Sequence, residues 1–104
     1  SDINKVFQTA FDLMSARLKS GQPAGVFVKA VQKDGYAEKL GIKTGDRILF
    51  YDRYPLSAVT QKFFLYDVHT SGLQQNKADI EIIVYRDGKL FRLSAKEGLL
   101  GIQL

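Results

Sequence analysis

Short apolar runs, each set off by turn-forming residues, are the feature that most constrains the fold of this 104-residue chain. Residues 26–31, 47–51, 80–85 and 90–93 are rich in Val, Ile, Leu and Phe, and glycine, proline or aspartate stands near each run. Such runs are typical of β-strands. The Asp-Gly pair between the last two runs predicts a β-hairpin. Because the predicted strands are short and closely spaced, we expect a small, partly open barrel or sandwich.

Helical patterns occupy other segments of the chain. Near the N-terminus, apolar residues recur three or four positions apart, as on one face of a helix: Ile3, Phe7, Phe11, Met14 and Leu18. We expect this stripe to pack on the core; docking on a neighbouring domain or on a second copy is the alternative. A short helix is expected over residues 36–40, ended by Gly41, and a longer one from Ser57 or Thr60 to about residue 70.

Composition limits the chemistry that the chain can perform. It contains no cysteine and one histidine, His69, and it lacks the spacing of a metal site or a nucleophile motif. We therefore expect no catalysis, no cofactor and no metal. The formal net charge is +4, but the basic residues stand singly and do not interleave with aromatic residues, so nucleic acid is not an expected partner. No apolar run approaches the ~20 residues of a membrane span, so membrane insertion is not expected either.

Residues 96–104 combine glycine, apolar side chains and a lysine in a pattern that suits a carboxylate. Gly98 and Gly101 bracket two leucines, and glycine permits positive φ and the close approach of a ligand. Successive backbone N–H groups can then form an anion-binding nest, and the apolar residues beside it would line a pocket. The pattern predicts a site for a peptide C-terminus; an ordinary turn between two edge strands is the alternative.

Residues 35–49, Gly-Tyr-Ala-Glu-Lys-Leu-Gly-Ile-Lys-Thr-Gly-Asp-Arg-Ile-Leu, resemble the central signature of a PDZ domain of the bacterial (HtrA-like) type. That signature has a small-residue turn, Ala-Glu, a helix that ends at glycine, an apolar residue, Gly-Asp and an Ile-Leu strand. The strand before it, the Pro-Leu-Ser entry to the long helix at 55–57 and the hairpin at 84–89 resemble the family in the same order. The resemblance covers residues 25–104.

In the family the basic residue and the glycine loop come first, whereas here Lys96 and Leu100-Gly101-Ile102 come last. The order resembles a circular permutation, cut between the strand of the loop and the strand at 26–31, which chain ends at a shared surface would tolerate. The implied fold class is α+β: a small, partly open β-barrel or sandwich of five to six short strands with two helices, plus an extra N-terminal helix. We expect residues 1–22 to form that amphipathic helix and residues 23–104 the PDZ-like domain.

The resemblance implies a non-catalytic protein-interaction module that binds peptide C-termini by β-strand addition. A peptide with an apolar last residue would add between the final strand and the long helix. The N–H groups of Leu100, Gly101 and Ile102 would receive its carboxylate, Lys96 would support it directly or through water, and Leu100 and Ile102 would shape the pocket. The implied peptide-binding residues are Lys96, Gly98, Leu99, Leu100, Gly101, Ile102, Gln103 and Leu104 near the C-terminus and Gln61, Phe64, Leu65 and Val68 on the long helix.

Gln61 stands where many eukaryotic members have the histidine that selects serine or threonine at the ligand's third residue from the end. This difference implies an apolar or unselective preference at that position. The alternative function is an assembly or regulatory PDZ-like domain of a larger protease or secretion protein, with an occluded or degenerate groove and a protease domain in the parent chain. The residues themselves leave the compartment undetermined, and only the resemblance slightly favours the bacterial cell envelope or periplasm.

Overall fold

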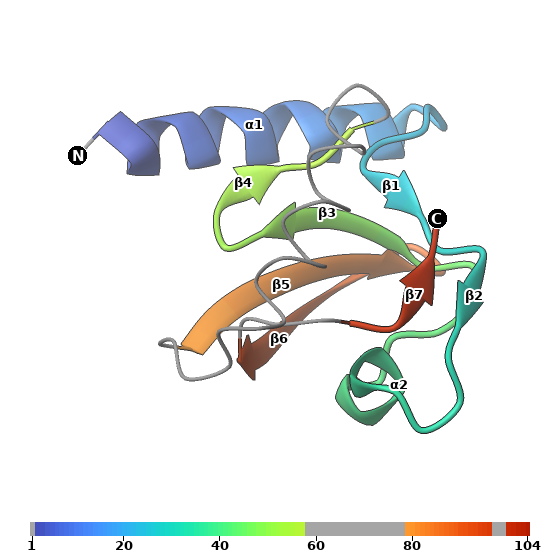
Figure 1. The fold of residues 1–104 in the computed structure, drawn as a ribbon. Coiled ribbons are helices and arrows are strands. Elements are labelled where there is room, and N and C mark those ends of the chain that lie inside the picture. The colour runs from blue at the N-terminus through green and yellow to red at the C-terminus, as the bar shows by residue number, and fades with distance from the viewer. Residues whose placement is uncertain (1, 58–78, 97–99) are drawn as a thin grey trace.

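The computed structural model describes residues 2–57, 79–96 and 100–104, with side chains from residue 4 onward. Its centre is a five-stranded sheet, with helix α1 (Asp2–Lys19) on one side and helix α2 (Tyr36–Leu40) on the other (Figure 1). This open, antiparallel arrangement with two helices confirms the expected α+β fold class. The long helix expected beyond Ser57 lies outside the described residues.

The large sheet is antiparallel and has the order β1-β3-β5-β6, with β4 also paired to β3. Its strands are β1 (Val26–Phe27), β3 (Arg47–Tyr51), β4 (Tyr54–Pro55), β5 (Asp79–Arg86) and β6 (Lys89–Lys96). The bounds of β3 and α2 are those that the sequence predicts, and the β5–β6 hairpin turns at Asp87 and Gly88 as expected. Both turn residues have positive φ, +49° and +79°, as in the type I′ turn that matches the twist of paired strands.

The run at residues 26–31, expected as one strand, divides into two strands that belong to different sheets. β1 pairs with β3, whereas β2 (Ala30–Val31) pairs antiparallel with β7 (Ile102–Gln103) in a separate two-stranded sheet. Between β1 and β2, the backbone of Val28 donates to the carbonyl of Asp46 at 2.8 Å and accepts from the N–H of Gly45 at 2.9 Å. The single-strand prediction is wrong because the two halves of the run pair with segments that lie far apart in the sequence.

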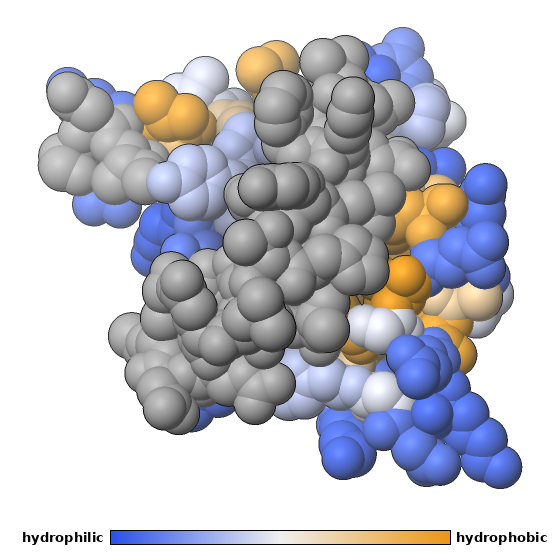
Figure 2. Space-filling model, viewed as in Figure 1, coloured by the Kyte–Doolittle hydropathy of each residue, from blue (hydrophilic) through white to orange (hydrophobic). Residues whose placement is uncertain are grey.

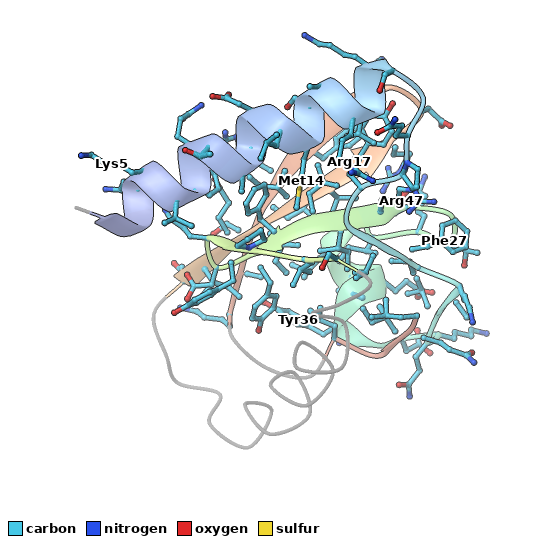
Figure 3. All side chains as sticks on the ribbon, turned by 90° about the horizontal axis from the view of Figure 1, so that it is seen from above. Lys5, Met14, Arg17, Phe27, Tyr36 and Arg47 are labelled. Carbon is cyan, nitrogen blue, oxygen red and sulfur yellow. The ribbon has the colours of Figure 1, made fainter. Side chains whose placement is uncertain are left out.

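Helix α1 packs its apolar stripe against one face of the sheet, as the sequence predicts. The cluster there consists of Phe7, Ala24, Leu49, Phe50 and Ile83, with Ala10, Phe11, Met14, Leu18 and Tyr85 packed around them. Phe7 is 6% exposed, and its ring centroid lies 4.8 Å from that of Phe50. Figure 3 shows Met14 pointing from α1 toward the sheet and Lys5 pointing away from it. No helix in the described ranges is both long and apolar enough to span a membrane.

The main core lies on the other face of the sheet, together with α2 and β7. Its buried members include Val26, Val28, Ala37, Ile48, Ile82, Val84 and Leu100, and Ile102 and Leu104 pack against them. Helix α1 and strand β7 therefore pack against different clusters, and Figure 1 shows them on different sides of the sheet.

An ion pair between buried Asp46 and partly exposed Arg86 closes the turn that leads into β3. The carboxylate of Asp46, 1% exposed, accepts hydrogen bonds from Nε and Nη2 of Arg86, each at 2.7 Å, and from the N–H of Lys43 at 2.8 Å. Arg86 Nη2 also donates to the carbonyl of Gly41 at 2.7 Å, just beyond α2. Burial pushes the pKa of the Asp46 carboxyl upward, but the hydrogen bonds from Arg86 and Lys43 and their positive charges outweigh burial, so this pKa lies below its usual value.

Candidate functional site

One edge of strand β7 pairs with β2, and no strand of the described part of the chain pairs with its other edge. In the register, Ile102 lies opposite Val31, and the N–H of Gln32 donates to the carbonyl of Gly101 at 2.8 Å. Ile102 therefore occupies a non-hydrogen-bonded pair, from which the backbone N–H and C=O point away from β2. These two groups are positioned to bond with an added strand.

Gly101 begins this strand with a backbone conformation that favours glycine. Its φ is +73°, in the left-handed region that L-residues rarely adopt. A Cβ at this position would lie 3.1 Å from Oε1 and 3.3 Å from Cβ of Gln32, and 3.7 Å from Cα of Gly35. Gly101 thus has the positive φ expected of a loop glycine, and crowding adds a second reason for the absence of a side chain.

The side chain of Leu100 is fully buried in the main core, with 0% of it exposed. Its carbonyl accepts a hydrogen bond from the N–H of Ala37 at 2.7 Å, in the first turn of α2. Leu100 therefore contributes its side chain to the core, and its role in shaping a ligand pocket stays a prediction. The backbone N–H is the group by which Leu100 would contact a carboxylate.

Lys96 ends β6 directly opposite Asp79, the first residue of β5. Its Nζ lies 2.7 Å from Oδ1 of Asp79, and the two side chains are 62% and 63% exposed. The hydrogen bond to Asp79, together with the negative charge of that carboxylate, raises the pKa of Lys96. Exposed ion pairs are weak and easily exchanged, so this contact does not prevent the ammonium group from turning to another carboxylate.

Tyr36 belongs to this region but is not singled out by the sequence pattern. Its Oη accepts a hydrogen bond from the backbone N–H of Lys96 at 2.6 Å, and Figure 3 labels its side chain at the start of α2. No local signal relates residue 36 to residue 96. The pairing of Asp79 with Lys96, in contrast, follows from the sequence, because both stand equally far from the Asp87-Gly88 turn that sets the hairpin register.

The remaining predicted residues fall into two groups. Ile102 and Leu104 are half-buried against the main core and Gln103 is exposed, and Figure 2 shows apolar surface around β7 and β2 with hydrophilic residues at its border. Outside the described residues lie Gly98, Leu99, Gln61, Phe64, Leu65 and Val68. Within the described ranges, no group of three or more acidic, histidine or cysteine side chains could hold a metal ion.

Known proteins resemble the chain at the level of sequence family and at the level of fold. A family model described as PDZ domain matches residues 12–64. Among solved structures 27 chains match; one is the PDZ domain of an SdrC-like protein from Listeria monocytogenes, with a TM-score of 0.56 and 22% identity over 78% of this chain and 87% of that chain. This structural likeness shows a shared fold. No curated protein matches the chain.

Proposed function

The chain belongs to the PDZ family, and from that premise we propose that it binds the C-terminus of another polypeptide at the edge of β7 that faces away from β2. PDZ domains are typically non-catalytic protein-interaction modules. The bound peptide would add as an antiparallel strand, with its carboxylate at the N–H groups of Leu100, Gly101 and Ile102. Lys96 would support the carboxylate, and an apolar last side chain would lie beside β7.

The backbone around Gly101 is the observation that carries this proposal. A glycine at positive φ allows successive N–H groups to turn to one side and form a nest for an anion, and Ile102 directs its N–H and C=O away from β2. Half-buried Ile102 and Leu104 add apolar surface next to these groups. Since one short strand and one pocket bury little area, we expect affinities of about micromolar strength.

We further propose that the domain is circularly permuted. In the family order the glycine loop and its strand come first, whereas β7 is the last strand here and pairs with β2, the second strand in chain order. Figure 1 shows the C-terminus near β1 and the end of α1, where the proposed cut falls. A rearranged chain that carries residues 97–104 ahead of residue 1 on a long flexible linker should fold and bind the same peptides; a folded but non-binding rearrangement would count against the permutation.

Fluorescence polarisation tests the proposed function directly. Labelled peptides with random C-terminal residues are each compared with the corresponding C-terminal amide. We expect free acids with an apolar last residue to bind, and the amides to bind at least about tenfold more weakly, because the amide lacks the charge that the nest and Lys96 would receive. If no free-acid peptide binds the folded protein, the proposal is wrong and an assembly or regulatory role becomes the better explanation.

Gly101→Val tests the position of the site. The valine would strain the backbone at φ +73° and crowd Gln32 and Gly35, which should turn the loop N–H groups away from the carboxylate. We expect peptide affinity to fall at least about tenfold while the far-UV circular dichroism spectrum stays that of a folded domain.

Gly88→Val is the matched control for this substitution. Gly88 also has positive φ, +79°, but nothing lies within 4 Å of an added Cβ, and the residue belongs to the β5–β6 turn. The Gly88→Val variant should be less stable because of the same kind of backbone strain, and its peptide affinity should be unchanged. Unchanged affinity in Gly101→Val, or an equal loss in both variants, would remove the assignment of the site to this loop.

A further inference from the structure

The hydroxyl of Tyr36 connects the first turn of α2 to the last residue of β6. The backbone N–H of Lys96 donates to Tyr36 Oη at 2.6 Å. One position further along α2, the N–H of Ala37 donates to the carbonyl of Leu100 at 2.7 Å. Two neighbouring residues of α2 thus hold the two residues, Lys96 and Leu100, that flank the undescribed residues 97–99.

Helix α2 is held in place at both of its ends. Ala37 is fully buried, and the half-buried Tyr36 packs against the main core. At the other end of the helix, Gly41 adopts φ +93° and its carbonyl accepts a hydrogen bond from Arg86, which is itself paired with Asp46. The start of α2 is therefore fixed relative to the sheet, and the position of the Tyr36 hydroxyl is fixed with it.

We propose that Tyr36 is a positioning residue for peptide binding, whose hydroxyl holds Lys96 in place so that the lysine and the N–H groups from Leu100 onward meet one carboxylate. This inference rests on the proposed function. A receptor that is already ordered loses less conformational entropy when it binds, so holding both residues in advance raises affinity. The bond itself is exposed, and water can replace it when the hydroxyl is removed, so its loss should affect the fold little.

Tyr36→Phe removes the hydroxyl and keeps the ring that packs on the core. The probe is a labelled pool of short peptides with a C-terminal leucine and randomised preceding residues, made once as the free acid and once as the amide. We expect the ratio of acid to amide affinity to fall about threefold to tenfold in Tyr36→Phe. The Lys96 amide should also exchange its hydrogen faster in the ligand-free protein, while the thermal midpoint stays within about 2 °C.

Tyr54→Phe is the matched control, since it removes the hydroxyl of a 62% exposed tyrosine on β4. It should change neither the affinity ratio nor the exchange of Lys96. If the parent protein prefers the free acid and Tyr36→Phe keeps the same ratio, the inference is overturned while the proposed function stands. An equal loss of affinity for acid and amide would show a purely structural role and would also overturn it. A parent protein with no preference for the acid would overturn both.

Discussion

The carboxylate of Asp46 is a buried charge that joins the turn before β3 to Arg86 at the end of β5. Asp46→Asn would leave the guanidinium of Arg86, whose side chain is 25% exposed, without its counter-ion, and we expect it to lower the free energy of unfolding by about 2 kcal/mol in urea denaturation at neutral pH. Glu81→Gln is the control. Glu81 pairs with Arg92 at 3.0 Å, but the two side chains are 36% and 54% exposed, respectively, so the pair should contribute less than about 1 kcal/mol to the free energy of unfolding. Similar losses in the two variants would show that burial of Asp46 does not matter.

Asp46 should also make stability depend on pH. Its pKa in the folded protein is lowered, so the unfolded chain binds the proton more tightly, and the stabilisation is present above the unfolded pKa, near 3.9. It is lost as the pH falls through the lower, folded pKa. We expect the unfolding free energy of the parent protein to decline below about pH 4 more steeply than that of Asp46→Asn. Parallel curves from urea titrations at a series of pH values would contradict this.

At the scale of elements, α1 stabilises the sheet through the ring of Phe7. This ring lies 4.8 Å from Phe50 and 6.0 Å from Phe11 between centroids, and the guanidinium carbon of Arg53 lies 4.6 Å from its centroid. Phe7→Ala should cost about 3 kcal/mol of unfolding free energy because it opens a cavity between helix and sheet. Val6→Ala is the control, because the preceding residue Val6 is 56% exposed, and it should change the unfolding free energy by no more than about 0.5 kcal/mol. Comparable costs in urea denaturation would mean that α1 does not pack as described.

Elements defined by local signals could be predicted from the sequence, and those defined by distant partners could not. The stripe through Phe7 gave α1 its buried face, Gly41 ended α2, and the Asp87-Gly88 pair positioned the hairpin. The division of residues 26–31 depends instead on which strands pair with Val26 and Val31, namely β3 and β7. No property of those six residues encodes that choice, because β-branched runs suit either sheet equally.

At the scale of the whole molecule, the described structure has two apolar clusters on opposite faces of one sheet. Since Leu49 and Ile48 are neighbours in β3 and belong to different clusters, loss of one cluster should expose the other. We therefore expect one cooperative unfolding transition, with the same urea midpoint for helical circular dichroism and for tyrosine fluorescence. Loss of helical signal at lower urea would show that α1 unfolds separately.

At the candidate site, too, the features that depend on local sequence could be predicted, and those that depend on distant contacts could not. The glycine pattern indicated positive φ at Gly101, which is confirmed, because that conformation depends on the residue itself. The burial of Leu100 and the bond from Lys96 to Tyr36 depend on how α2 packs beside β7. The sequence pattern contains no signal for such packing. The conformation of Gly101 could therefore be predicted, but not the contacts that α2 makes with Lys96 and Leu100.

The outer strand β6 has a consequence for how copies of this molecule behave at high concentration. Among the described strands β6 pairs only with β5, and it runs for eight residues, long enough to recruit another strand. Its charges at Lys89, Arg92 and Lys96 oppose such recruitment, because like charges repel when two copies align. β7, with no charged residue and a length of two, is too short to sustain an extended intermolecular sheet. Among the described strands, the edge of β7 that faces away from β2 can therefore stay uncharged without promoting the growth of an intermolecular sheet.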